Sequence, residues 1–195
     1  MNNGIINRFS QDYIIDIFKA LEFASFKHRH QKRKGAAGIP YINHPIGVAL
    51  QLLTHLQNPS KEIIITALLH DILEDTSTKA EEIKIRFGEE VLNLVKEVTD
   101  DMSLSSRERK EIQIIRAGSL SKEAQHIKIA DKICNIRDIL ATSIYWTRRQ
   151  KIRYIENAVS VISRIKNPDK KLIREFKNSL TEAENALKCS FTIES

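Results

Sequence analysis

Apolar residues recur along the chain at the three- and four-residue spacing of helices that bury one face. Ser10 is a candidate N-cap for the first such segment. A second segment opens at His44-Pro45, because proline suits the first helical turn, and a third begins at Pro59-Ser60. Strand-like alternation never extends beyond a few residues, so the pattern predicts an all-α protein. The expected core face of the first helix is Ile14, Ile17, Phe18, Leu21 and Ala24.

The pattern also indicates how the helices are arranged. Residues 63–69 are apolar nearly all round, which places that helix in the middle of a bundle. A capping box at residues 78–81 starts a later short helix, and Gly88 is expected to end it. Another capping box, at residues 105–108, starts the next helix. A helix from about 123 to 140 follows, and then two amphipathic segments on either side of Asn167-Pro168-Asp169.

We therefore expect one domain over residues 1–195, folded as a single orthogonal helical bundle. Its motif-bearing core runs from about 21 to 140, and its C-terminal helices from about 145 to 188. No apolar run approaches the roughly 20 residues that a membrane-spanning helix needs. Residues 1–4 lack the features of a secretory signal, so we expect a cytoplasmic protein with no membrane partner. The two cysteines, Cys134 and Cys189, show neither metal-motif spacing nor a disulfide framework, and we expect buried free thiols.

Positive charge is concentrated in residues 27–34, within a chain of net charge +6. Such a cluster can bind nucleic acid or a multiply phosphorylated small molecule. It can also be a solvated helix end, where cations suit the helix dipole. No nucleic-acid-binding motif accompanies the cluster, so we do not expect a nucleic-acid partner.

The clearest anomaly in the pattern is His70-Asp71, which ends the most apolar segment of the chain. Such a pair is costly to bury unless its groups have partners. Glu74 and Asp75 follow four residues after His70 and Asp71, on the same face if the helix continues. Two carboxylates on one turn repel each other unless a positive charge lies nearby, and a divalent cation supplies one.

Two further positions complete a candidate metal site. His44 starts a helix, and Asp131 shares a helical face with Asn135 and Asp138. Taken alone, that face would be a solvent-exposed stripe. Together with His70-Asp71, however, the set offers two imidazoles and two carboxylates, which suit Mn²⁺, Fe²⁺ or Zn²⁺. Four protein ligands leave positions open on a six-coordinate ion, and open positions indicate catalysis.

The order H…HD…D resembles the HD phosphohydrolase superfamily. A fuller set of motifs is similar to the hydrolase domain of the RelA/SpoT homologues, and closest to the stand-alone small alarmone hydrolases. The resemblance covers about residues 21–140, with weaker similarity in the C-terminal helices. The segments that carry it are Tyr41-Ile42-Asn43-His44-Pro45, Leu68-Leu69-His70-Asp71-Ile72-Leu73-Glu74-Asp75-Thr76, Val98-Thr99-Asp100-Asp101 and Ala130-Asp131-Lys132-Ile133-Cys134-Asn135.

The resemblance implies a specific enzyme activity. It implies hydrolysis of the 3′-pyrophosphate of ppGpp or pppGpp to GDP or GTP and pyrophosphate, with one Mn²⁺ ion, or with Fe²⁺, Co²⁺ or Zn²⁺ in its place. The implied metal ligands are His44, His70, Asp71 and Asp131, the implied catalytic carboxylates are Glu74 and Asp75, and the implied substrate contacts are Arg33, Lys34 and Asn135.

This chain departs from the family pattern in two places, and two alternative functions stay open. Ile133-Cys134 stands where relatives often carry Leu-Tyr or Leu-His, and residues 35–39 are small where relatives often place a charge or hydroxyl. One alternative is an HD hydrolase acting on another nucleotide, such as NADPH. The other is a non-catalytic nucleotide-binding module, which is disfavoured because no implied ligand or catalytic carboxylate is missing from the chain.

Overall fold

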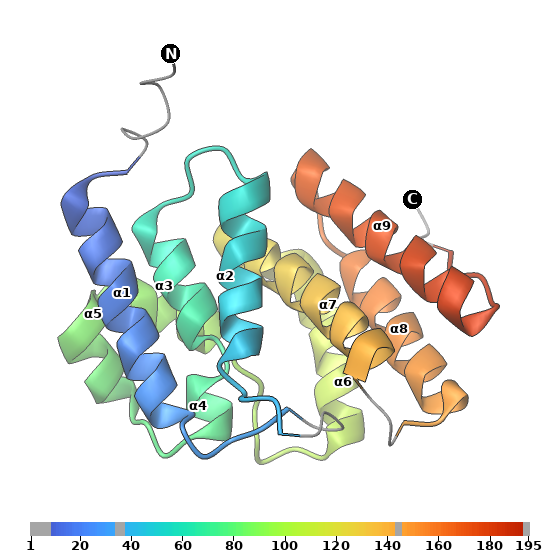
Figure 1. Ribbon diagram of the computed structural model, residues 1–195, viewed down its shortest axis with the longest axis horizontal. Helices are drawn as coiled ribbons and strands as arrows, with labels where there is room; N and C mark the ends of the chain where they lie inside the picture. Colours follow the sequence, from blue (N-terminus) through green and yellow to red (C-terminus); the bar gives the residue numbers. More distant parts are fainter. Residues whose placement is uncertain (1–8, 34–37, 143–145, 193–195) are drawn as a thin grey trace.

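The computed structural model describes residues 9–33, 38–142 and 146–192, and in them it contains helices and one isolated β-bridge, between Lys32 and Pro40, but no strand. The prediction of an all-α bundle is confirmed (Figure 1). In chain order the helices are α1 (Gln11–Lys27), α2 (Asn43–His55), α3 (Lys61–Leu69), α4 (Ile72–Asp75), α5 (Ala80–Val98), α6 (Ser106–Arg116), the 3₁₀ helix η1 (Ala117–Ser119), α7 (Lys122–Thr142), α8 (Arg148–Ile162) and α9 (Lys170–Leu187).

Helix α3 forms the centre of the bundle. The side chain of Ser60 caps it by accepting a hydrogen bond from the Ile63 N–H at 3.3 Å. All residues from 63 to 69 are buried, because α1, α2, α5 and α7 all pack against this helix. In Figure 1, α1 and α2 lie on either side of α3. The predicted central position of this segment is confirmed. Because His70 directly follows Leu69, the His70-Asp71 pair lies at the C-terminal end of this buried helix.

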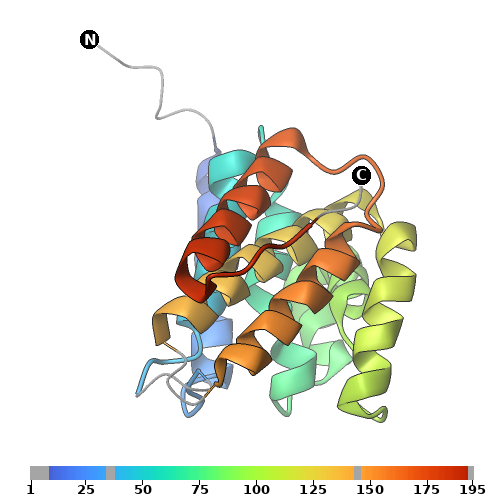
Figure 2. The same ribbon diagram turned by 90° about the vertical axis from the view of Figure 1, so that its right-hand side faces the viewer.

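Helix α7 is the second element that organises the core. It packs against α2, α3 and α5 through fully buried side chains such as Ile127, Ile133 and Ile136. Helices α8 and α9 cover α7 on the side that Figure 2 turns toward the viewer. The buried Leu172 and Phe176 of α9 lie in this layer. Within the described residues, no helix has the length and apolar character needed to cross a membrane.

The predicted core face of α1 is wrong in part. Ser10 does cap the helix, accepting from the Tyr13 N–H at 3.2 Å. The buried residues, however, are Ala20, Phe23 and Ala24, whereas Ile14 and Phe18 are 47% and 63% exposed. The face that turns inward is the one that brings Phe23 into edge-to-face contact with Phe87 of α5, with ring centroids 5.5 Å apart. The apolar residues of α1 lie on two sides of the helix, and tertiary packing selects between them.

Helix α5 also differs from its predicted limits. Its N-cap is Lys79, one residue later than expected, and only half of a capping box forms: Glu82 Oε1 accepts a hydrogen bond from the Lys79 N–H at 3.2 Å. Gly88 does interrupt the helix with a φ of +90°, but a second helical stretch follows at once and runs to Val98. Both cysteines are free thiols, as expected, although they are half-buried rather than buried.

Candidate metal centre

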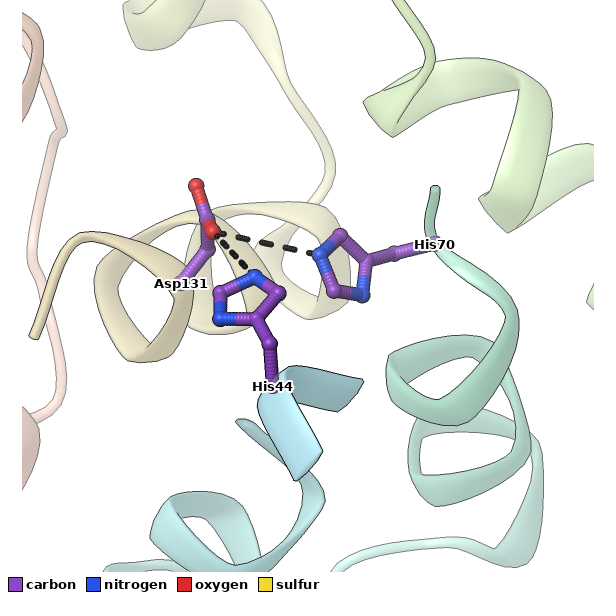
Figure 3. Close-up of side chains that lie close together, drawn as sticks. All are labelled: His44, His70 and Asp131. Atoms are coloured by element: carbon purple, nitrogen blue, oxygen red, sulfur yellow. Dashed lines mark ion pairs between the residues drawn. The ribbon is translucent and has the colours of Figure 1, made fainter. Parts of the chain in front are cut away.

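The ends of α2 and α3 meet the middle of α7 at one point (Figure 3). His44 is the second residue of α2, His70 directly follows the last residue of α3, and Asp131 lies on α7. In Figure 3 both imidazole rings point toward the Asp131 carboxylate. The side chains of His44, His70 and Asp131 are all buried, so α7 turns Asp131 toward the core rather than toward solvent.

The side-chain donor atoms of this cluster are close together. The Nε2 atom of His44 lies 3.1 Å from Asp131 Oδ1 and 3.7 Å from Asp71 Oδ2. The Nε2 atom of His70 lies 3.1 Å from Asp71 Oδ2 and 3.8 Å from Asp131 Oδ1. One ligand atom each from His44, His70 and Asp131 lies within 4.8 Å of the others. Asp71 joins the cluster through the two histidines.

The hydrogen bonds of His70 leave one ring nitrogen for a cation. Its Nδ1 lies 2.8 Å from the Ala67 carbonyl oxygen, so Nδ1–H donates there and Nε2 faces the carboxylates. Among the described residues, buried Nε2 has no partner with hydrogen-bond geometry. Burial is the largest single influence and would lower the pKa of His70, but Asp71, Asp131 and the Ala67 carbonyl together outweigh it and raise that pKa to about 9. The surroundings of Nε2 therefore favour a positive charge, either a proton or a metal ion.

The four side chains also fit a divalent cation by their spacing and chemistry. Ligand atoms at about 2.0–2.2 Å from one ion are separated by about 3 Å at right angles and about 4 Å when opposed. The four distances between 3.1 and 3.8 Å fall in this range. Two imidazoles and two carboxylates without a thiolate suit a catalytic Mn²⁺, Fe²⁺ or Zn²⁺ better than a structural zinc ion.

Neighbouring groups fix the orientation of both carboxylates. The Tyr41 hydroxyl donates to Asp71 Oδ2 at 2.5 Å, and Asn135 Nδ2 donates to Asp131 Oδ1 at 2.5 Å. The buried Lys132 ammonium lies 3.4 Å from Asp131 Oδ2 and 5.8 Å from the centroid of the Tyr154 ring. Contacts of this kind orient the ligand side chains in metal sites.

Glu74 and Asp75 lie directly beside this cluster, on the short helix α4. Glu74 Oε1 accepts a hydrogen bond from the main-chain N–H of Asp100 at 2.6 Å. Burial is the largest influence on Glu74, and it raises the pKa of this carboxyl to about 7. A carboxyl with a pKa of about 7 can exchange a proton near neutral pH. Asp75, the last residue of α4, is exposed.

Arg33 is separated from the rest of the basic cluster by its contacts. Its Nη2 donates to Asn135 Oδ1 at 2.7 Å and lies 2.7 Å from Asp138 Oδ2. Its guanidinium lies 5.5 Å from the centroid of the Tyr41 ring. Only 16% of the Arg33 side chain is exposed, so this residue does not belong to a solvated helix end. Lys34 lies outside the described residues, and its role stays a prediction.

One cavity of about 300 Å³ brings together every described residue that the sequence analysis assigned as a metal ligand, catalytic carboxylate or substrate contact. These are Arg33, His44, His70, Asp71, Glu74, Asp75, Asp131 and Asn135. A second cavity of about 320 Å³ shares Arg33, Asp75 and Asn135 with the first and extends toward Trp146 and Ile139. The two cavities provide space for a substrate larger than a single phosphate.

The sequence analysis assigned no role to several polar residues that line the first cavity, among them Tyr41, Lys132, Asp100 and Gln113. Tyr41 was visible only as part of the motif that contains His44. Lys132 carried a stronger signal, a cation between the core-facing Ala130 and Ile133, and the structure buries it. Asp100 and Gln113 also line the cavity, and Gln113 had no signal because it belongs to a surface helix.

Comparisons with known proteins identify the family of this chain. A family model described as HD domain matches residues 20–158. The chain is 40% identical over 164 residues to the guanosine-3′,5′-bis(diphosphate) 3′-pyrophosphohydrolase MESH1 of Homo sapiens, covering 83% of this chain and 91% of that protein. The enzyme of the same name from Drosophila melanogaster is 39% identical, over 79% of this chain and 87% of its own length.

A solved structure gives the same relationship. It is that of a metazoan ortholog of SpoT that hydrolyses ppGpp and plays a role in starvation responses. It superposes with a TM-score of 0.81 at 35% identity and covers 86% of this chain and 94% of its own. The family model spans most of this chain, and these relatives match it over most of their own length. The chain therefore belongs to the HD-domain family and groups within it with the guanosine-3′,5′-bis(diphosphate) 3′-pyrophosphohydrolases.

Proposed function

We propose that this protein hydrolyses the 3′-pyrophosphate of ppGpp and pppGpp, releasing pyrophosphate and GDP or GTP. The observation that carries the proposal is the buried cluster of His44, His70 and Asp131, which lies beside Glu74 in one cavity. The relatives named for this reaction match the chain along most of their length, which supports the same activity here.

We propose His44, His70, Asp71 and Asp131 as the ligands of a single divalent cation. The described contacts support this set, because the unpartnered Nε2 of His70 faces the two carboxylates. Mn²⁺ is the ion we propose, with Fe²⁺, Co²⁺ and Zn²⁺ as substitutes that the same donors accept. Such an ion supplies Lewis-acid chemistry to a phosphoryl oxygen and to the attacking water.

Glu74 and Asp75 are the proposed catalytic carboxylates. The amide of Asp100 engages Oε1 of Glu74. Among the described residues no hydrogen bond is made to Oε2, which is left to accept a proton from the attacking water. With its pKa raised to about 7 by burial, Glu74 is well matched to that role near neutral pH. Asp75 lines both cavities and would orient the water or the departing pyrophosphate.

Arg33 and Asn135 are the proposed contacts to the nucleotide, and Lys34 is proposed with them. A guanidinium can meet a phosphate with two hydrogen bonds or stack on a base. Arg33 lies at the junction of the two cavities, where the nucleotide would pass from one to the other. The substrate would be a free nucleotide in the cytoplasm, and the proposal includes neither nucleic acid nor a membrane. We also propose that the whole chain acts as one domain, since α7 packs against helices from both halves of the chain.

The direct test is to incubate the purified protein with ppGpp and Mn²⁺ and to measure the release of GDP and pyrophosphate. Turnover should require the ion and should stop when a chelator is added. NADPH is assayed in parallel, because faster release of phosphate from NADPH would identify a different substrate for the same site. Absence of turnover of ppGpp with Mn²⁺, Fe²⁺, Co²⁺ and Zn²⁺ alike would overturn the proposal.

A further inference from the structure

Helix α6 touches the active-site cavity through one polar side chain. None of its residues, Ser106–Arg116, is buried, so the helix contributes little to the core. Gln113, however, lines the cavity, and its Nε2 donates to Asp100 Oδ2 at 2.5 Å. The main-chain N–H of Asp100 in turn donates to Glu74 Oε1 at 2.6 Å. Two hydrogen bonds therefore connect the surface helix to the carboxylate proposed as the base.

The main chain before Asp100 is fixed by other contacts. The Thr99 N–H and hydroxyl both donate to the Val95 carbonyl oxygen, at 3.0 and 2.7 Å. The Lys128 ammonium of α7 donates to the Val98 carbonyl oxygen at 2.7 Å. These contacts hold the chain as far as Thr99. The described hydrogen bond to the Asp100 side chain comes from Gln113.

Without the hydrogen bond from Gln113, repulsion between carboxylates would disfavour the observed position of Asp100 beside Glu74. Both Asp71 and Asp100 are negative charges close to Glu74, and Lys128 is the positive charge that faces it. Without the hydrogen bond from Gln113, the Asp100 carboxylate would be free to move toward solvent or toward a cation, and the main chain at Asp100 would lose a restraint on the direction of its N–H. The amide at 2.6 Å is the group that fixes Glu74 Oε1.

We propose that Gln113 is a positioning residue for the hydrolytic reaction. It holds the Asp100 side chain so that the Asp100 amide orients the Glu74 carboxylate toward the cavity. This inference rests on the proposed function, because it assigns Gln113 a part in the reaction that Glu74 would assist. A purely structural alternative is that Gln113 only fastens α6 to the bundle. Helix α6 also packs against α8, so it has attachment that does not depend on this side chain.

The first test compares variants of one helix. Gln113→Ala removes the donor, and Gln113→Glu keeps the shape but places a carboxylate against Asp100. Each should lower kcat for ppGpp by about tenfold to a hundredfold, as expected when a reacting group is misplaced by about 1 Å. KM and the Mn²⁺ content should stay at wild-type values. The matched control is Ile115→Ala, because Ile115 lies on the same helix, is 78% exposed and should be silent. An unchanged kcat in Gln113→Ala, or a change confined to KM, would overturn the inference.

A double-mutant cycle separates positioning from a loss of stability. If Gln113 acts through Glu74, the double variant Glu74→Gln/Gln113→Ala should be no slower than Glu74→Gln alone. Additive losses would show that Gln113 acts by another route and would overturn the inference.

A third measurement does not depend on activity. Amide hydrogen exchange at Asp100 should accelerate in both Gln113→Ala and Glu74→Ala, because either change releases that N–H. If the wild-type protein does not turn over ppGpp, the proposed function fails, and the exchange measurement still decides the link. Unchanged hydrogen exchange at Asp100 in Gln113→Ala would then overturn the proposed link between Gln113 and the Asp100 amide.

Discussion

Arg33 and Asn135 lie 102 positions apart in the sequence and are joined by a 2.7 Å hydrogen bond from the guanidinium Nη2 to the amide Oδ1. The same guanidinium pairs with Asp138 at 2.7 Å. Arg29, from the same basic cluster, instead lies 4.1 Å from the centroid of the Phe26 ring and is exposed. The cluster therefore contains both a half-buried arginine at the site, Arg33, and an arginine on the surface, Arg29.

This division predicts different effects for two similar substitutions. Arg33→Lys should raise KM for ppGpp by roughly tenfold and leave kcat less affected, because an ammonium cannot reproduce the planar two-bond contact of a guanidinium. The matched control, Arg29→Lys, should leave both constants unchanged. Steady-state kinetics with saturating Mn²⁺ give both values. Equal KM values for the two variants would show that Arg33 does not contact the nucleotide.

Loss of a proposed metal ligand should abolish ion binding without unfolding the protein. Asp131→Ala and Asp71→Ala should each lose bound Mn²⁺, measured as metal content per chain, and with it all turnover. Mn²⁺ at a hundred times its Kd should stabilise the wild-type protein by about 2.7 kcal/mol, and this increment should vanish in both variants. Glu74→Ala is the control, because it should keep the ion while losing most of the rate. Loss of the ion in Glu74→Ala would make Glu74 a ligand and contradict its assignment as the base.

The buried Glu74 carboxyl should make the stability of the metal-free protein depend on pH. Burial raises its pKa to about 7 from an ordinary value of 4.5. Between these two values the folded state binds the proton more tightly than the unfolded state does. The free energy of unfolding therefore falls as pH rises from about 4.5 to about 7.

Urea denaturation at several pH values measures this contribution. Glu74→Gln removes the titrating group, so its stability should fall less steeply over that interval than the stability of the wild-type protein. Glu90→Gln, which changes an exposed glutamate of α5, should show the wild-type slope. Parallel curves for Glu74→Gln and the wild type would mean that Glu74 titrates alike in the folded and unfolded states.

The clustering of His44, His70, Asp71 and Asp131 could be predicted because these residues differ in polarity from the apolar residues around them. His70-Asp71 follows a helix whose residues 63–69 are all buried, and Asp131 lies on a helix with a buried core side. Polar groups at such positions need partners, and the few polar residues available narrow the choice. Burial, the donor types and the family motifs all lead to the same cluster.

The supporting contacts could not be predicted in this way. Gln113 lies on a helix with no buried residue, and its bond to Asp100 depends on how α6 is placed against the loop after α5. The inward face of α1 was ambiguous for a similar reason, since Phe18 and Phe23 are equally apolar and only Phe23 meets Phe87. Such relationships depend on packing between distant segments, which periodicity along one helix does not describe.

Gly88 interrupts a helix, as the sequence predicts, but α5 continues beyond it to Val98. The conformation of Gly88 leads to a stability prediction. Its φ of +90° strongly disfavours a side chain, yet nothing lies within 4 Å of where a Cβ would be. Gly88→Ala should therefore cost only backbone strain, about 1–3 kcal/mol. In a chain of this size each kcal/mol lowers Tm by about 2–4 °C, which calorimetry measures.

The matched control for this prediction is Gly47→Ala. Gly47 lies inside α2, and an added Cβ would meet Cys134 Sγ at 3.4 Å, an acceptable contact. Because alanine restricts the unfolded chain more than glycine does, Gly47→Ala should gain about 0.4–1 kcal/mol. If Gly88→Ala were as stable as the wild type, α5 would be able to straighten into one continuous helix, and the kink would not be a requirement of the fold.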